Sequence, residues 1–455
     1  MPPLMSAFII VLFCVPLLVG TLLSLWFRRK SLSLADAFLL GIAAHFGAYS
    51  LIDLSIVGDA HLDAATVAAV FVSVVIPAAA IWFFAKYGPR RIRSETSLAR
   101  LTEDWRSTHW FMIAALIIAL WGYRFYTNTL VSSHAVFAAA DLDSINQGLP
   151  YWYTSVWQIS AELMFVAGTA AFWKQINSRG LTKLLWLLLA IGAIIFTFWL
   201  GRRPLFVLLA LVFWMVTAGT NRRRPLLAMT LLILAVPVML VASNLFQTYR
   251  MASYRGVPVV DLLSDRSAAD IAKTAIDVEK TSSNLQRRQA IWRFNYDVIN
   301  AHQDGRGSLH WGQLMFGEIP IYIPSAILPG KEWVDAEVKL QRTLGLPVFD
   351  QAGNIFAFSY GEVGLLSIIA APALMILFVF VTAFALRFIK DPFLRILVMG
   401  FAIHYAINIE GRYTTPVFIV RNLIIIAIAY IVARTAVRLG RQLIRSVGRR
   451  EMSAH

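Results

Sequence analysis

The chain has 455 residues, of which 58% are hydrophobic and 15% are charged. Soluble domains carry roughly 25% charged residues, so this composition excludes an ordinary soluble globule and requires lipid around much of the surface. The formal net charge of +15 would suggest nucleic acid in a soluble protein. Here the basic residues cluster between apolar runs, which is typical of membrane topology, and we expect no nucleic-acid partner.

Apolar runs recur along the whole chain, and a membrane-spanning helix needs about 20 mostly apolar residues. The predicted spans are 5–26, 35–57, 64–85, 109–127, 154–173, 182–200, 205–220, 226–246, 361–386, 393–410 and 415–436. The stretch 313–330 is also apolar, but it carries Glu318 and three prolines, which favours a re-entrant or interfacial segment. The sequence therefore predicts an all-α polytopic membrane protein with about eleven helices, between ten and twelve.

Basic clusters give these spans an orientation, because one follows every odd-numbered span. The clusters are Arg28–Lys30, Lys86–Arg106, Lys174–Lys183, Arg222–Arg224, Arg387–Arg395 and Arg434–Arg450. Loops retained in the cytoplasm carry such an excess of Lys and Arg. The N-terminus is therefore predicted outside and the C-terminus inside, which requires an odd number of spans and agrees with eleven.

This topology divides the chain into four parts. Residues 1–249 hold membrane helices one to eight, 250–353 form one large outer loop, 354–436 hold helices nine to eleven, and 437–455 form a basic cytoplasmic tail. Within the loop, 262–301 is predicted helical in two pieces, and a Pro-rich aromatic stretch follows. A structured loop of this length is more than a connection and tends to carry function.

Two arginines at the outer end of the sixth span break the charge rule. Arg202 and Arg203 follow Gly201 in a tight turn into the seventh span. The planar guanidinium fork binds phosphate in a bidentate manner. Two interpretations stay open at this point, which are contacts to phospholipid headgroups in general and a specific site for a lipid diphosphate.

A second polar group lies at the outer end of the tenth span. Glu410 and Arg412 bracket the predicted turn, with His404 before them and Arg421 inside the next apolar run. Ionisable groups in spans are costly and usually face a protein interior or a water-filled cavity. Glu410 pairing with a neighbouring arginine, and His404 acting as a packing residue, are the alternatives to a functional site.

Signatures of soluble enzymes are missing from the sequence. It has no P-loop, no zinc-ligand spacing, no dinucleotide-binding glycine turn and no serine elbow. Its single cysteine, Cys14, excludes an intramolecular disulfide and a cysteine-based metal cluster. We therefore expect neither a metal nor a cofactor.

Three segments carry a resemblance to a known family. They are Leu200–Leu205 with its Gly-Arg pair, the Pro-rich stretch Ile319–Lys331, and the polar entry to the ninth span, Asn354–Gly364. Together with the large outer loop in the second half of the chain, they resemble the Wzy-type oligosaccharide repeat-unit polymerases of bacteria. The resemblance to the O-antigen ligases is more distant.

The resemblance implies a membrane glycosyltransferase of surface polysaccharide biosynthesis, such as O-antigen or exopolysaccharide. It would lie in the bacterial inner membrane, with its N-terminus and large loop periplasmic, and join undecaprenyl-diphosphate-linked repeat units at the periplasmic face. The sugar–diphosphate bond already stores the energy, so neither metal nor nucleotide is required. The implied partners are the lipid-linked glycan and membrane lipid, and a chain-length regulator protein is a further candidate.

The chemistry so implied assigns roles to the exceptional residues. Cationic groups stabilise the diphosphate leaving group, and a base takes the proton of the acceptor hydroxyl. Arg203 and Glu410 are the expected catalytic residues. The expected substrate-binding residues are Arg202, Arg412, Arg421, Arg287, Arg288 and Arg293. Glu362 and His302 are alternative bases, since arginines near Glu410 lower its pKa. Trp311 is among the loop aromatics that either stack on sugars or form an apolar core.

Two other functions stay open from the sequence. An O-antigen ligase would use the same donor and pass the glycan to a lipid-A core. A glycan or lipid transporter would need ionisable residues at mid-span along a water-lined path. The exceptional charges gather instead at the predicted outer face, which favours chemistry at that surface over transport.

Overall fold

The computed structural model describes residues 33–48, 68–69, 71–96, 107–176, 178–200, 290–323, 336–346, 353–409 and 420–432, the last without 429, together with a few isolated positions. Every regular element in these ranges is a helix, which confirms the predicted all-α class for this part of the chain. The predicted first, seventh and eighth spans lie mainly outside the described residues. The count of eleven therefore stays a prediction.

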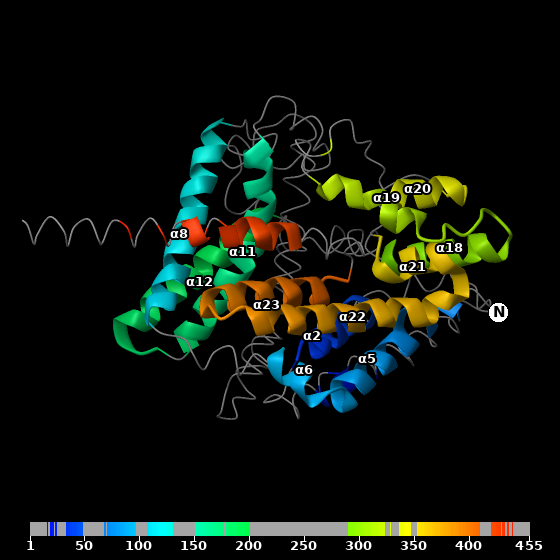
Figure 1. The fold of residues 1–455 in the computed structure, drawn as a ribbon, viewed down its shortest axis with the longest axis horizontal. Coiled ribbons are helices and arrows are strands. Elements are labelled where there is room, and N and C mark those ends of the chain that lie inside the picture. The colour runs from blue at the N-terminus through cyan, green and yellow to red at the C-terminus, as the bar shows by residue number, and fades with distance from the viewer. Residues whose placement is uncertain are drawn as a thin grey trace, which may run out of the picture.

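The helices keep the labels of Figure 1. In chain order they are α2 (Leu34–Ile42), the π-helical η2 (Ala43–Ala48) and η4 (Phe71–Val75), α5 (Ile76–Tyr87), α6 (Arg90–Glu95), α8 (Ser107–Leu130), α11 (Tyr151–Ile176), α12 (Gly180–Leu200), α18 (Ala290–Gln303), α19 (Gln313–Tyr322), α20 (Ala336–Thr343), α21 (Ile355–Val363), the 3₁₀ turn η6 (Gly364–Leu366), α22 (Ser367–Phe388) and α23 (Pro392–Ile407).

Side-chain caps explain where several of these helices begin. The Asn354 side chain accepts hydrogen bonds from the backbone N–H groups of Phe356 and Ala357, both at 3.1 Å, and starts α21. Asp391 caps α23 in the same way, with Pro392 in the first turn. Such caps satisfy N–H groups that have no partner inside the helix. The helix starts are therefore encoded locally.

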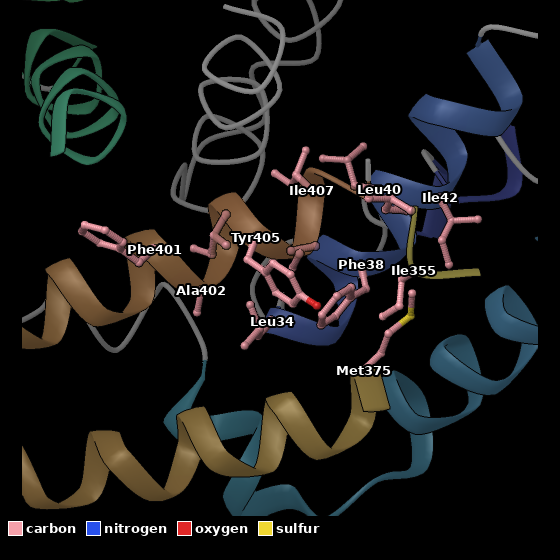
Figure 2. Packing of buried hydrophobic residues seen from close by; sticks show 14 of the residues in the cluster. Leu34, Phe38, Leu40, Ile42, Ile355, Met375, Phe401, Ala402, Tyr405 and Ile407 are labelled. Atoms are coloured by element: carbon pink, nitrogen blue, oxygen red, sulfur yellow. The ribbon is translucent and has the colours of Figure 1, made fainter. Parts of the chain in front are cut away.

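Helix α2 is the centre of the packing, and all of its residues are buried. It contacts α5, α22 and α23. Phe38 of α2 meets the rings of Phe378 and Tyr405 edge-on, each at 6.0 Å between ring centres. Figure 2 shows Phe38 beside Tyr405 of α23, with Met375 of α22 nearby. Apart from Asp36, which accepts hydrogen bonds from Ser33, α2 is apolar on every side, and such a helix belongs in an interior.

Helices α8, α11 and α12 form a second group (Figure 1). Trp110 and Trp186 join α8 to α12, with their ring centres 5.5 Å apart. This group connects to the first through α11 and α23, where the His404 ring stacks on Phe165 at 4.5 Å. This contact supports the interpretation of His404 as a packing residue.

The loop unit consists of α18, α19 and α20, which gather around α21 at the start of α22 (Figure 1). Asn295 of α18 donates a hydrogen bond to the Ser73 hydroxyl at 2.9 Å, which fixes the unit against η4. Helix α18 confirms the second predicted helical piece of the loop from residue 290 onward, and the first piece lies outside the described residues. The loop unit therefore stands at one end of α22, and α6 packs near the other.

Apolar side chains cover much of the exposed surface. On α12 they form a stripe at helical spacing, with Leu181, Leu184, Leu188, Ile191 and Ile195 all exposed. Judged by length and composition, two helical segments among the described residues are able to cross a membrane, Gly180–Thr197 and Ile355–Phe388. These segments cover most of the predicted sixth and ninth spans.

Candidate active site

Most of the arginines predicted from the sequence lie outside the described residues, and so does Glu410. The undescribed residues are Arg202, Arg203, Arg287, Arg288, Glu410 and Arg412. Arg293 lies on α18, but its side chain is outside the described part. Arg421 donates from Nε and Nη2 to the Asn422 side-chain oxygen, at 3.3 and 3.1 Å. The lipid-diphosphate site therefore stays a prediction.

The loop unit brings together a different polar group, here named the histidine cluster: His302, His310, Tyr360 and Glu362. His302 lies in the last turn of α18, and the chain then reverses through Asp304–Gly307. The backbone N–H of His310 donates to the Gly361 carbonyl at 3.1 Å. The rings of His302 and Tyr360 lie 5.7 Å apart. Both histidines are thereby seated against α21.

Glu362 holds this arrangement together. Its carboxylate accepts hydrogen bonds from the backbone N–H groups of Gly312 at 2.5 Å and Met315 at 2.8 Å. Gly312 is the N-cap of α19 and has no side chain with which to cap the helix. A carboxylate at a helix N-terminus is favoured by both the free N–H groups and the helix dipole. Glu362 is thus engaged as a cap supplied from another helix, which weakens its case as a base.

Replacing Glu362 with glutamine is expected to loosen the start of α19. The amide keeps one acceptor oxygen but turns an NH₂ group toward a backbone N–H, and a hydrogen bond to a charged group contributes roughly 1.5–3 kcal/mol. Hydrogen exchange of the amides at 312–316 should accelerate about tenfold or more. Asp304→Asn is the matched control, because Asp304 pairs with Arg306 on the surface and such pairs contribute little. Equal exchange in both variants would contradict the capping role.

Both histidines are kept neutral by their surroundings. Burial lowers the pKa of His302 below its usual 6.5, and the neighbouring His310 lowers it further, whereas the nearby Gly361 carbonyl opposes the shift. Burial also lowers the pKa of His310, with Glu362 opposing this effect and Lys339 adding to it. The two ring nitrogens of His302 and Nε2 of His310 are shielded from solvent. A neutral imidazole of this kind is able to accept a proton at neutral pH.

Trp311 stands beside the cluster with an unusual backbone. Its φ is +49°, the one positive value among the described non-glycine residues, and its side chain is 67% exposed. Its N–H donates to the Glu362 carbonyl at 2.9 Å, which holds the turn. Strained conformations of bulky residues concentrate at functional sites. An exposed indole face is suited to stacking on a sugar ring.

The cluster thus combines two imidazoles of lowered pKa with one exposed indole. Within the described ranges, no group of three or more His, Cys, Asp or Glu side chains is placed to hold a metal ion. Sequence reasoning found His302 and Glu362 but missed His310. His310 follows His302 by eight residues, and Gly305 and Gly307 lie between them. A turn at these glycines brings the two histidines close together, and this pattern was visible in the sequence.

Comparison with known proteins finds no matching family model, no matching curated protein and no matching solved structure. The resemblance therefore rests on its three sequence segments. The Pro-rich stretch and the polar entry meet in space. The first begins within α19, the second contains α21, and these two helices are in contact. Glu362 of the polar entry caps the helix that leads into the Pro-rich stretch. The remaining segment, Leu200–Leu205, lies outside the described residues from Gly201 onward, and Arg202 and Arg203 with it.

Proposed function

We propose that this chain is a membrane-embedded glycan polymerase, which joins undecaprenyl-diphosphate-linked oligosaccharide repeat units at the periplasmic face of the inner membrane. The observation that carries the proposal is the histidine cluster: two neutral imidazoles and an exposed tryptophan, held in a loop unit on the end of an apolar helix of membrane-spanning length. Such a position suits a substrate whose lipid lies in the bilayer and whose sugars lie outside it.

The exposed apolar stripes support the membrane setting. Leu181, Leu184, Leu188 and Ile191 follow one face of α12 and are each at least 42% exposed. Contiguous apolar surface of this extent is rare on soluble proteins and marks contact with a membrane or with another protein. Lipid acyl chains cover such a stripe along its whole length. We also propose the polytopic topology, with the N-terminus in the periplasm and the C-terminus in the cytoplasm.

The chemistry is a glycosyl transfer. A hydroxyl oxygen of the acceptor sugar attacks the anomeric carbon of the donor glycan, and the bond from that carbon to the diphosphate oxygen breaks. The diphosphate leaves with the electron pair, stabilised by Arg202 and Arg203. The hydroxyl proton passes to a base. His302 is the candidate with a described site, and Glu410 is the candidate from the sequence.

Purified protein in lipid nanodiscs, given a synthetic lipid-diphosphate-linked repeat unit, should produce a ladder of products on a gel. The ladder should form without nucleotide and in the presence of EDTA. Lipid-linked intermediates from a deletion strain separate the alternatives. Loss of a polymerase leaves single repeat units on the carrier, whereas loss of a ligase leaves long polymer on it. Repeat units trapped on the cytoplasmic side would identify a transporter instead.

Arg203→Ala and Glu410→Ala should each abolish chain extension while membrane levels of the protein stay normal. The first removes a cation from the leaving group, and the second removes a candidate base and a neighbour of Arg412. Chain length on a silver-stained gel and immunoblotting of the membrane fraction give the two measurements. Full-length polymer from both variants would show that the assignment of these two residues is wrong.

A further inference from the structure

A group of exposed basic residues lies at the end of α22 that points away from the loop unit. This basic rim consists of Arg90, Arg91, Arg387 and Lys390. Helix α6, which carries the first two, packs against α22, which ends just after Arg387. Figure 1 shows α6 and the loop unit toward opposite ends of α22. The rim is therefore separate from the histidine cluster.

Two acidic side chains near the rim, among the described residues, have partners outside it. Glu95, the one acidic residue of α6, pairs with Arg395 at 3.5 Å. Asp391 caps α23 and also accepts a hydrogen bond from the Tyr430 hydroxyl at 2.8 Å. An anionic ligand is the natural complement of such a surface.

Aromatic side chains adjoin the rim on α5. Trp82, Phe83 and Tyr87 are 40%, 61% and 58% exposed. The Lys86 ammonium lies over the Trp82 ring at 4.9 Å and over the Tyr87 ring at 5.0 Å. Exposed Trp and Tyr beside basic residues are typical of the membrane–water interface, where the ring is half in lipid and half in water. This combination of rings and cations suits a position at the level of lipid headgroups.

An apolar stripe leads directly to the rim along α22. Leu377, Val381, Phe384 and Phe388 are all exposed and recur at intervals of three or four residues, so they share one face of the helix. The stripe ends two residues before Lys390. A ligand that follows it would need an apolar tail along α22 and a negative head at its end. Nucleic acid and acidic proteins supply the charge but not the tail.

We propose that the basic rim binds anionic phospholipid, with the headgroup phosphate on Arg90, Arg91, Arg387 and Lys390 and an acyl chain along the α22 stripe. Because the rim and the histidine cluster lie toward opposite ends of α22, this lipid site does not depend on the proposed polymerase activity. The bound lipid would hold the junction between α5 and α6 against the C-terminal end of α22. Bound lipid would thereby brace the packing of α5 and α22, which meet at Phe84 and Phe380 with ring centres 5.6 Å apart.

Native mass spectrometry of the full chain in detergent tests the proposal, with phosphatidylglycerol and phosphatidylethanolamine of matched acyl chains as probes. We expect the anionic lipid to bind more tightly. The double variant Arg90→Gln/Arg387→Gln should weaken its binding about tenfold or more, since each Lys or Arg near an anionic membrane contributes roughly a fivefold effect. The matched control is Arg306→Gln/Arg342→Gln, which removes two exposed cations from the loop unit and should leave the affinity unchanged.

Two further binding measurements identify the chemistry of the ligand. Phe384→Ala/Phe388→Ala should weaken phosphatidylglycerol binding, and glycerol phosphate at the same concentration should not displace the lipid. Equal affinity for the two lipids, equal losses in the two double variants, or displacement by glycerol phosphate would each overturn the proposal. Tighter binding of a short oligonucleotide than of phosphatidylglycerol would overturn it in favour of a soluble polyanion.

Discussion

The variant His302→Ala should lose about 100-fold or more in the rate of chain extension, because general base catalysis contributes typically 10²–10⁴-fold. His302 is half-buried against α21 with its ring nitrogens shielded from solvent, and its lowered pKa keeps the ring neutral at neutral pH. Removal of the imidazole leaves the acceptor hydroxyl without this base. The rate is measured with the synthetic lipid-linked repeat unit.

Controls separate catalysis from folding in this test. Gln303→Ala changes the next, exposed residue of α18 and should leave the rate unchanged. Added imidazole should restore part of the activity of His302→Ala, because it supplies the missing base without restoring any packing. Full activity in His302→Ala would exclude His302 as the base and leave Glu410 as the remaining candidate.

The pH profile of the wild-type chain should follow the same residue. Activity should fall as the pH drops below 6.5 toward the lowered pKa of His302, because the protonated ring accepts no further proton.

Stability should change in the same direction. In the unfolded chain His302 and His310 take up protons near pH 6.5, whereas in the folded chain they do so only at lower pH. The free energy of unfolding is therefore highest above pH 6.5 and declines as the pH falls below it. The activity of His302→Gln should not show the wild-type titration.

Gly41→Ala should destabilise the chain by about 1–3 kcal/mol or more, the typical cost of overpacking a core. A Cβ at Gly41 would stand 2.6 Å from the Ala406 carbonyl oxygen and 2.7 Å from that of Ile407. These are backbone atoms of α23 and its end, so no side-chain rotation relieves the clash. Helices α2 and α23 would have to separate around Phe38 and Tyr405. Thermal unfolding in detergent, followed by tryptophan fluorescence, measures the loss.

Gly122→Ala is the matched control for Gly41→Ala. Gly122 also lies inside a helix, α8, but a Cβ there meets nothing within 4 Å. Alanine is favoured over glycine in helix interiors by up to about 1 kcal/mol, so this variant should be unchanged or slightly more stable. The same unfolding temperature for both variants would show that α2 and α23 do not pack as closely as described.

Among the described residues, the sequence by itself determined the position of several long apolar helices. The apolar runs 182–200 and 393–410 predict α12 and α23 to within a few residues, because a segment with many apolar side chains and few charges is stable only as a buried or lipid-facing helix. The caps Asn354 and Asp391 mark two helix starts through contacts of three residues or fewer. These features depend on neighbours along the chain and can be seen in the sequence.

Only the tertiary structure decided which polar residues act together. His302 and His310 come to lie against Tyr360 and Glu362 because the chain reverses after α18 and returns beside α21, across a separation of about fifty residues. Glu362 was a candidate base in the sequence, yet its carboxylate is engaged by the N–H groups of another helix. The same distant packing lowers the pKa of the two histidines through burial. Burial and long-range contacts are properties of the folded chain, and no local pattern of residues encodes them.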